Sequence, residues 1–89
     1  MTREQVTITN KLGLHARAAA KLVHTASVFE SEIFIGTEHE EVNAKSILGI
    51  LTLAATKGTP LVVRADGSDE KAAVAAIAAL FADKFGEGQ

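Results

Sequence analysis

The chain has 89 residues, of which 47% are hydrophobic, and its formal net charge is −2. This length and composition fit one small globular domain over residues 1–89 and exclude a disordered chain. The absence of cysteine excludes disulfides and thiolate metal sites, and the absence of Trp, Tyr and a large basic patch argues against nucleic acid as a partner. No apolar run is long enough to span a membrane and no signal peptide is visible, so we expect no membrane partner and a cytoplasmic protein.

The first third of the chain predicts a strand, a loop and a helix. Val6 and Ile8 alternate with polar residues in 5–9, which is typical of a half-buried strand. Residues 10–14 form the connecting loop, and residues 16–27 follow as a helix. This helix has an apolar stripe at helical spacing, made of Ala19, Leu22, Val23 and Ala26.

The middle of the chain predicts a hairpin and a second helix. The hairpin joins strands at 31–35 and 41–43 through a turn at 36–40. Ser46 stands at the N-cap of a helix that extends to about residue 55, because a serine hydroxyl readily accepts a backbone hydrogen bond there.

The last third predicts a strand at 61–65 and an alanine-rich helix at 70–85, capped by Ser68 or Asp69. We expect Gly86 to end this helix and the residues beyond it to fray. Its apolar stripe consists of Val74, Ile77, Phe81 and Phe85.

The order of elements, β-α-β-β-α-β-α, predicts an α+β fold. Each helix has an apolar side that must be buried, and the strands together offer one apolar face. We therefore expect an open-faced β-sandwich, in which a four-stranded antiparallel sheet carries three helices on one face.

The second helix is unusual because apolar residues surround it. The side predicted to pack on the sheet carries Ile50, Leu53 and Ala54. The opposite side carries Ile47, Leu48 and Leu51. In so small a domain these three predict an exposed apolar patch that binds a protein partner, and the alternative is that a loop covers them.

A glycine, a histidine and an arginine lie around the start of the first helix. The free N–H groups and the dipole of a helix start favour a bound anion. Gly13 allows a sharp bend of the backbone, and Arg17 offers donors suited to phosphate oxygens. His15 supplies a nitrogen nucleophile, so the pattern fits a transient phosphohistidine. On spacing alone, the alternative is a surface histidine that caps the helix.

Two segments resemble those of one family. The first, residues 10–22 (NKLGLHARAAAKL), resembles the active-site segment of the HPr family, the histidine-containing phosphocarriers of the bacterial phosphoenolpyruvate:sugar phosphotransferase system. The second, residues 42–55 (VNAKSILGILTLAA), resembles the regulatory segment of the same family. The resemblance implies that Nδ1 of His15 accepts a phosphoryl group, stabilised by the Arg17 side chain and by the N–H groups of Ala16 and Arg17. It implies a carrier rather than a stand-alone enzyme, without a metal or an organic cofactor.

The resemblance also implies the partners. Enzyme I, charged from phosphoenolpyruvate, would donate the phosphoryl group, and EIIA-type domains would accept it. HPr kinase/phosphorylase would phosphorylate Ser46, which would place about two negative charges at a helix start beside the apolar patch. The implied docking surface comprises Ala20, Ile47, Leu48 and Leu51.

Two alternatives to a sugar-branch carrier stay open. The NKLG loop also resembles the nitrogen-branch paralogue NPr, although KSILG favours the sugar-type protein. The second alternative is a regulatory binding module that acts mainly through Ser46, with His15 idle. We expect His24 to lie at the rim of the docking surface or to be solvated, and His39 to be solvated in an acidic turn, rather than either to bind a metal.

Overall fold

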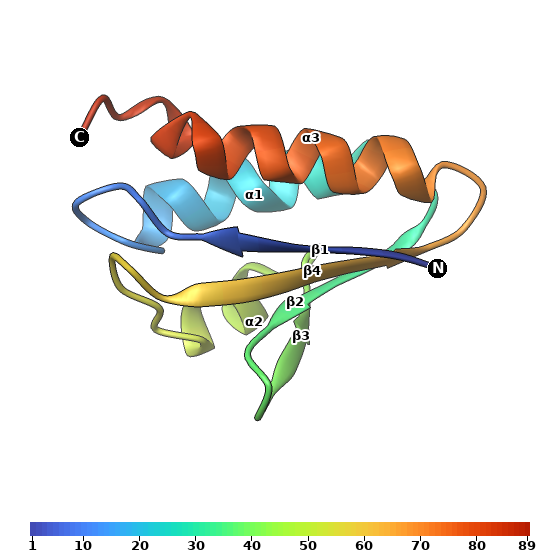
Figure 1. Cartoon of the computed structure of the whole chain (residues 1–89), viewed down its shortest axis with the longest axis horizontal. Helices are drawn as coiled ribbons and strands as arrows, with labels where there is room; N and C mark the ends of the chain where they lie inside the picture. Colours follow the sequence, from blue (N-terminus) through green and yellow to red (C-terminus); the bar gives the residue numbers. More distant parts are fainter.

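The computed structural model describes residues 1–89 and contains one four-stranded sheet with helices packed on it (Figure 1). The strands are β1 (Thr2–Thr7), β2 (Glu32–Gly36), β3 (Glu41–Asn43) and β4 (Pro60–Asp66). The helices are α1 (Ala16–Ser27), α2 (Ile47–Thr52) and α3 (Glu70–Ala82), and a 3₁₀ turn, η1, follows at Lys84–Gly86. The predicted order of elements is confirmed.

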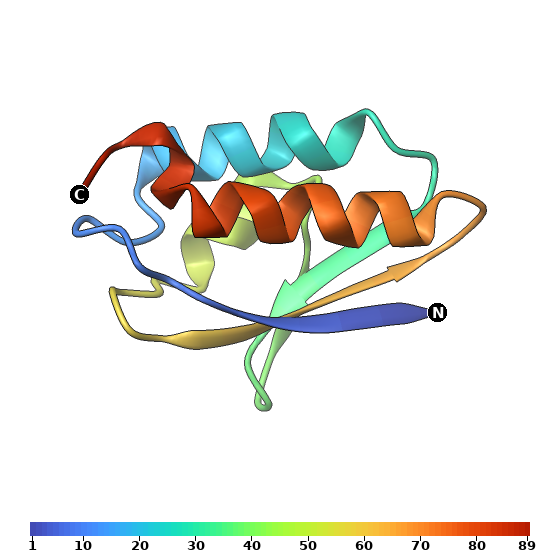
Figure 2. The ribbon, with the colours of Figure 1, turned by 45° about the horizontal axis from the view of Figure 1, so that its top comes forward.

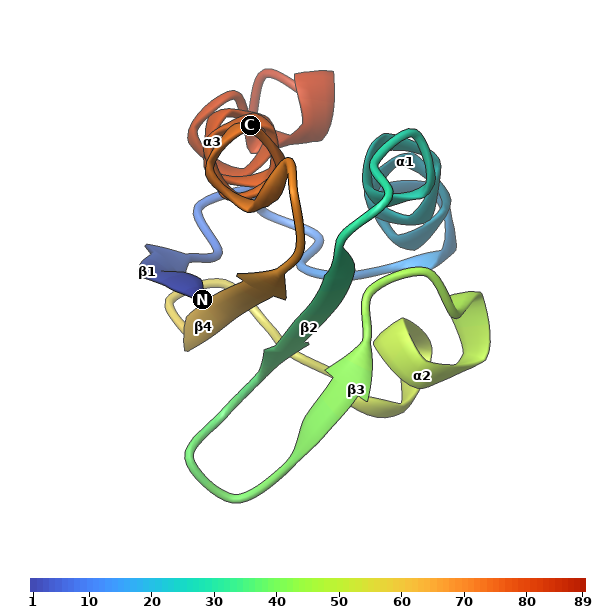
Figure 3. The same ribbon diagram turned by 90° about the vertical axis from the view of Figure 1, so that its right-hand side faces the viewer.

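The sheet has the order β1-β4-β2-β3, and all neighbouring strands are antiparallel. Seen along the strands, α3 lies over β1 and β4, α1 lies beside α3 and packs on α2, and α2 lies beside β3 (Figure 3). The opposite face of the sheet carries no helix (Figure 3). The predicted α+β open-faced sandwich is therefore confirmed.

The core lies between the helices and the covered face of the sheet. Both predicted helical stripes contribute to it, because burial of their apolar surface drives the packing. The largest fully buried apolar side chains are Phe81, Phe85, Ile8, Leu22, Ile33, Ile35, Ile50, Leu61, Ile77 and Val63. Val23 differs from the rest of the α1 stripe in being only partly buried against the core.

The first strand begins earlier than predicted and ends earlier. It pairs with β4 from Thr2 opposite Ala65 to Thr7 opposite Pro60. Among its residues only Val6 is buried, so its first half has no apolar alternation for the sequence to show. Hydrogen bonds to β4 extend the strand where the periodicity does not.

The second helix is shorter than predicted. It ends at Thr52, and the amides of Leu53 and Ala54 bond to carbonyls three residues back. Ala54 then adopts a left-handed backbone with φ of +48° and is exposed, so its predicted packing on the sheet is wrong. Ile50 is buried and Leu53 partly buried, as predicted.

The last helix also ends early, at Ala82. Lys84 and Phe85 have φ of +54° and +55°, and this left-handed turn directs Phe85 back into the core. Asp69 occupies the N-cap position, but its carboxylate accepts hydrogen bonds from Ser31 and Glu30 instead of capping α3.

The residues beyond Gly86 contact the rest of the protein, which the sequence did not predict. The Lys11 amide donates to the backbone oxygen of Gln89 at 2.8 Å. The C-terminus consequently lies beside the loop that joins β1 to α1 (Figure 2). This end of the molecule also carries the start of α1, where the predicted site lies (Figures 1 and 2).

Candidate functional site

The loop before α1 is shaped by a close contact with the segment after α2. Gly13 has φ of +68°, and a Cβ at this position would lie 2.6 Å from the carbonyl oxygen of Ala55. The Leu14 amide donates to the same oxygen at 3.0 Å. Only glycine combines this backbone conformation with this approach, so the contact fixes the residue that follows, His15.

His15 is the N-cap residue of α1. Its backbone is extended, with φ of −79° and ψ of 178°, and its Nδ1 accepts the Arg17 amide at a nitrogen–nitrogen distance of 3.2 Å. The imidazole is 26% exposed. Nδ1 therefore lies over the first turn of the helix, where backbone N–H groups lack intrahelical acceptors and the helix dipole is positive.

The other imidazole nitrogen contacts the C-terminal segment. Nε2 of His15 binds Oε2 of Glu87, a side chain that is only 9% exposed. The Asn10 amide donates to Oε1 of the same carboxylate at 3.0 Å. The hydrogen bonds from His15 and Asn10 hold the pKa of Glu87 below its ordinary value, although partial burial opposes this shift.

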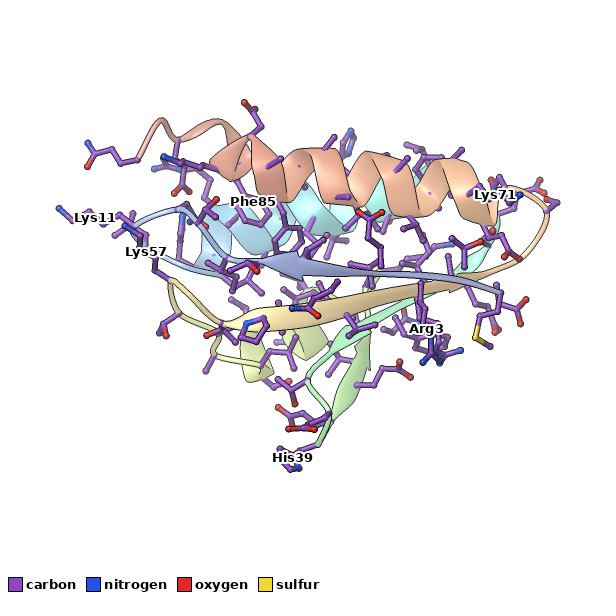
Figure 4. The ribbon with its side chains drawn as sticks, viewed as in Figure 1. Arg3, Lys11, His39, Lys57, Lys71 and Phe85 are labelled. Atoms are coloured by element: carbon purple, nitrogen blue, oxygen red, sulfur yellow. The ribbon has the colours of Figure 1, made fainter.

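Arg17 lines a cationic hollow beside the imidazole. The hollow has a volume of about 440 Å³, and its charged lining residues are Lys11, Arg17, Lys21 and Glu87. Figure 4 shows the Lys11 side chain projecting from this end of the molecule. Three cationic side chains against one acidic side chain favour an anionic group in this place.

The two backbone groups predicted to bind phosphate oxygens are the first amides of α1. Ala16 and Arg17 are both exposed there. The Arg17 N–H is bound to Nδ1 of His15, so it becomes available to an oxygen only when Nδ1 has another partner. The Ala16 N–H stands at the first helical position, which has no intrahelical acceptor.

The apolar patch on α2 is exposed. Ile47, Leu48 and Leu51 are 41%, 73% and 36% exposed, so the alternative in which a loop covers them is wrong. Ala20, the fourth residue of the predicted docking surface, is exposed on α1, which packs against α2. The structure thus brings the predicted docking residues onto two adjoining helices.

Ser46 is the N-cap residue of α2, as predicted. Its hydroxyl oxygen accepts the Gly49 amide at 3.2 Å. The neighbouring Lys45 ammonium donates to the carbonyl oxygen of Phe29 at 2.7 Å, which directs it toward the end of α1 rather than toward the hydroxyl.

The other two histidines lie apart from this site. His24 is exposed on α1, and His39 lies at the tip of the β2–β3 hairpin, 3.9 Å from an exposed Glu38 carboxylate (Figure 4). No group of three or more His, Cys, Asp and Glu side chains is arranged to hold a metal ion. None of the helices is long and apolar enough to cross a membrane.

Sequence reasoning missed three residues of the site: Asn10, Lys21 and Glu87. Asn10 is completely buried, Lys21 donates to the carbonyl oxygen of Phe85, and Glu87 lies in the segment expected to fray. The only sequence signal was a glutamate between two glycines after the last helix, which by itself has no specificity.

Comparison with known proteins agrees with this fold and site. A family model described as the PTS HPr component phosphorylation site matches residues 2–83. The phosphocarrier protein HPr of Xylella fastidiosa (strain Temecula1) is 53% identical over 98% of both chains. The phosphocarrier protein NPr of Shewanella violacea is 48% identical over 93% of this chain and 91% of its own.

A solved structure of HPr from Thermoanaerobacter tengcongensis superimposes with a TM-score of 0.94 at 45% identity, covering 98% of each chain. Fold and site together define a small histidine-bearing component of the phosphotransferase system. The chain belongs to the HPr family.

Proposed function

We propose that the protein is a cytoplasmic phosphocarrier and not a stand-alone catalyst. His15 accepts a phosphoryl group from Enzyme I, which is charged from phosphoenolpyruvate, and passes it to EIIA-type domains. The observation that carries this proposal is the position of Nδ1, which lies 3.2 Å from the Arg17 amide nitrogen at the start of α1. A cationic hollow adjoins it.

The transfer needs no group that the chain lacks. The lone pair of Nδ1 forms a bond to phosphorus while the bond from phosphorus to the donor nitrogen breaks, and its electron pair returns to the donor. The transition state is loose, with charge on three phosphoryl oxygens, so positioning and charge stabilisation dominate. The first amides of α1 and the Arg17 guanidinium supply that stabilisation.

The Arg17 amide changes its partner during this step. Before transfer it donates to Nδ1, and a bond between Nδ1 and phosphorus removes that acceptor. The N–H then binds a phosphoryl oxygen, together with the Ala16 N–H. The donor is thus already oriented at the site and needs little reorganisation.

The proposed docking surface serves donor and acceptor in turn. Ala20, Ile47, Leu48 and Leu51 are exposed on α1 and α2, the helix that starts at His15 and its neighbour. An apolar patch beside a partly exposed imidazole lets a partner bury the patch and reach Nδ1 in one encounter. Enzyme I and EIIA-type domains would then compete for it.

We further propose that HPr kinase/phosphorylase regulates this docking through Ser46. A phosphate on its hydroxyl would lie at the start of α2, where the helix dipole stabilises it. It would also place about two negative charges next to Ile47 and so weaken apolar docking without unfolding the domain.

Phosphorylation with purified partners tests the carrier function. The protein is incubated with phosphoenolpyruvate and Enzyme I, and its intact mass is recorded before and after acid treatment. We expect one acid-labile phosphoryl group, absent in His15→Ala. Arg17→Ala should accept the phosphoryl group roughly a hundredfold more slowly than the wild type, and Arg17→Lys should lose less of the rate than Arg17→Ala. Arg3→Ala is the matched control, because Arg3 lies on the open face of the sheet (Figure 4).

The same assay separates the alternatives. Labelling only by the nitrogen-branch Enzyme I would assign the protein to the NPr branch. The NKLG loop and the 48% identity to an NPr are the observations that favour this alternative. Labelling by neither enzyme would overturn the carrier function and favour the regulatory module acting through Ser46.

A further inference from the structure

The C-terminal segment brings a carboxylate to His15 that the proposed carrier function does not yet use. We propose that Glu87 is a positioning residue: it holds the imidazole in the tautomer that carries its proton on Nε2 and thereby leaves Nδ1 as the nucleophile. The consequence for transfer rests on the proposed carrier function. The tautomer itself is a property of the unphosphorylated protein.

The segment that carries Glu87 is anchored on both sides. On one side, Phe85 is 1% exposed, and its ring lies 4.9 Å from that of Phe81 in an edge-to-face arrangement. On the other side, the backbone oxygen of Gln89 accepts a hydrogen bond from the Lys11 amide. The left-handed backbone of Lys84 and Phe85 costs free energy, so packing of the Phe85 ring is what holds it.

The carboxylate of Glu87 is held by two groups. Its Oε1 accepts the side-chain amide of Asn10, which also donates to the Gly13 carbonyl oxygen at 2.8 Å. Asn10 is completely buried, so this amide has a fixed orientation. The remaining oxygen, Oε2, then faces Nε2 of His15.

The two contacts of the imidazole require the same tautomer. An ionised carboxylate can only accept hydrogen bonds, so Nε2 is the donor in its contact with Glu87. The Arg17 amide can only donate, so Nδ1 is the acceptor and carries the lone pair. Glu87 and the Arg17 amide thus both favour the tautomer with its proton on Nε2.

This proton position suits the chemistry of transfer. The Nδ1 lone pair forms the bond to phosphorus, and Nε2 keeps its proton throughout, so no proton moves and Glu87 stays ionised. Bonding to phosphorus draws electron density from the ring, which makes the Nε2–H group more positive. A carboxylate fixed beside it stabilises that charge and orients the ring, as acidic partners of functional histidines do.

The test compares Glu87→Gln and Glu87→Ala with the wild type, and Glu40→Gln is the matched control because Glu40 is exposed at the hairpin turn. If glutamine keeps its oxygen on the Asn10 amide, its NH2 group faces Nε2 and can only donate; if it turns its oxygen toward Nε2, it loses the bond from Asn10. The substitution therefore preserves the packing while weakening the preference for the Nε2–H tautomer.

Long-range proton–nitrogen NMR of the His15 ring gives the first measurement. We expect mainly the Nε2–H form in the wild type and Glu40→Gln, and a mixture of tautomers in both Glu87 variants. The second measurement is phosphoryl acceptance from Enzyme I. Its maximal rate should fall roughly tenfold to a hundredfold in the Glu87 variants, at an unchanged half-saturating concentration of Enzyme I.

An unchanged tautomer in both Glu87 variants would overturn the proposal, and so would a changed tautomer with an unchanged maximal rate. If Enzyme I labels none of the proteins, including the wild type, the carrier function fails and the role of Glu87 in transfer fails with it. The NMR spectra distinguish that case, since they report the tautomer without any transfer.

Discussion

Gly13 and Ala55 approach each other so closely that no side-chain atom fits between them. A Cβ on Gly13 would lie 2.6 Å from the Ala55 carbonyl oxygen and 3.1 Å from the Cα of Thr56. Gly13 belongs to the loop before His15, and Ala55 follows α2, which carries the proposed docking patch. This contact therefore sets the position of the nucleophile relative to the docking helix.

Gly13→Ala tests this contact against backbone strain alone. We expect a loss of about 2 kcal/mol or more in the free energy of unfolding, because a left-handed alanine must also displace the Ala55 carbonyl. Gly58→Ala is the control, since Gly58 has φ of +92° but nothing within 4 Å of the position that a Cβ would take. Urea unfolding measures both, and equal losses would show that the close approach contributes nothing.

Leu48→Glu tests the docking patch. Leu48 is 73% exposed, so the substitution should change the free energy of unfolding by less than about 0.5 kcal/mol. We expect the half-saturating concentration of Enzyme I in the phosphorylation assay to rise about tenfold or more. Val28→Glu is the matched control because Val28 is 68% exposed just beyond α1, and an equal effect of the two variants would contradict a localised patch.

Two substitutions separate the structural role of Ser46 from its proposed regulatory role. Ser46→Ala removes the N-cap acceptor of α2 and should lower the free energy of unfolding by about 1 kcal/mol, whereas Ser68→Ala in an exposed turn should not. Ser46→Asp keeps an acceptor but adds charge beside the patch, so it should slow phosphorylation of His15 by Enzyme I. An unchanged rate in Ser46→Asp would count against regulation through this residue.

The Glu70 carboxylate should make the free energy of unfolding depend on pH in the acid range. Hydrogen bonds from Thr2, from the N-terminal amine and from the Gly67 amide lower the pKa of Glu70 from 4.5 to about 2. Since the folded state favours the ionised carboxylate, its stabilisation is complete above pH 4.5 and is lost as the pH falls toward about 2.

Glu70→Gln should therefore be less stable than the wild type at neutral pH, and this difference should shrink between about pH 5 and about pH 2. Urea unfolding across that range gives the measurement. Glu4→Gln is the charge-matched control, because Glu4 is an exposed glutamate in β1. A difference that stays constant over the range would show that the Glu70 carboxylate is not preferentially ionised in the folded state.

The parts of the fold that follow a periodic pattern could be predicted from the sequence. The stripe of α1 and the N-cap position of Ser46 depend on local spacing, and the structure confirms both. The end of α2 could not be predicted, because Ala54 takes the left-handed conformation that usually indicates glycine. The first half of β1 is defined by pairing with β4 and has no apolar pattern of its own.

The site divides in the same way. His15 at the N-cap of α1 and Arg17 as the second residue of that helix follow from adjacent positions in the sequence. Glu87 reaches His15 across 72 residues, through a left-handed turn that is held by packing of the Phe85 ring. Neither the turn nor the contact has a local signature, so only the tertiary structure shows them.

The central claim is that Nδ1 of His15 carries the phosphoryl group. Long-range proton–nitrogen and phosphorus NMR of the protein after incubation with phosphoenolpyruvate and Enzyme I tests it most directly. The account predicts phosphorus bonded to Nδ1 and a proton retained on Nε2. A phosphoryl group on Nε2, or on any residue other than His15, would contradict it.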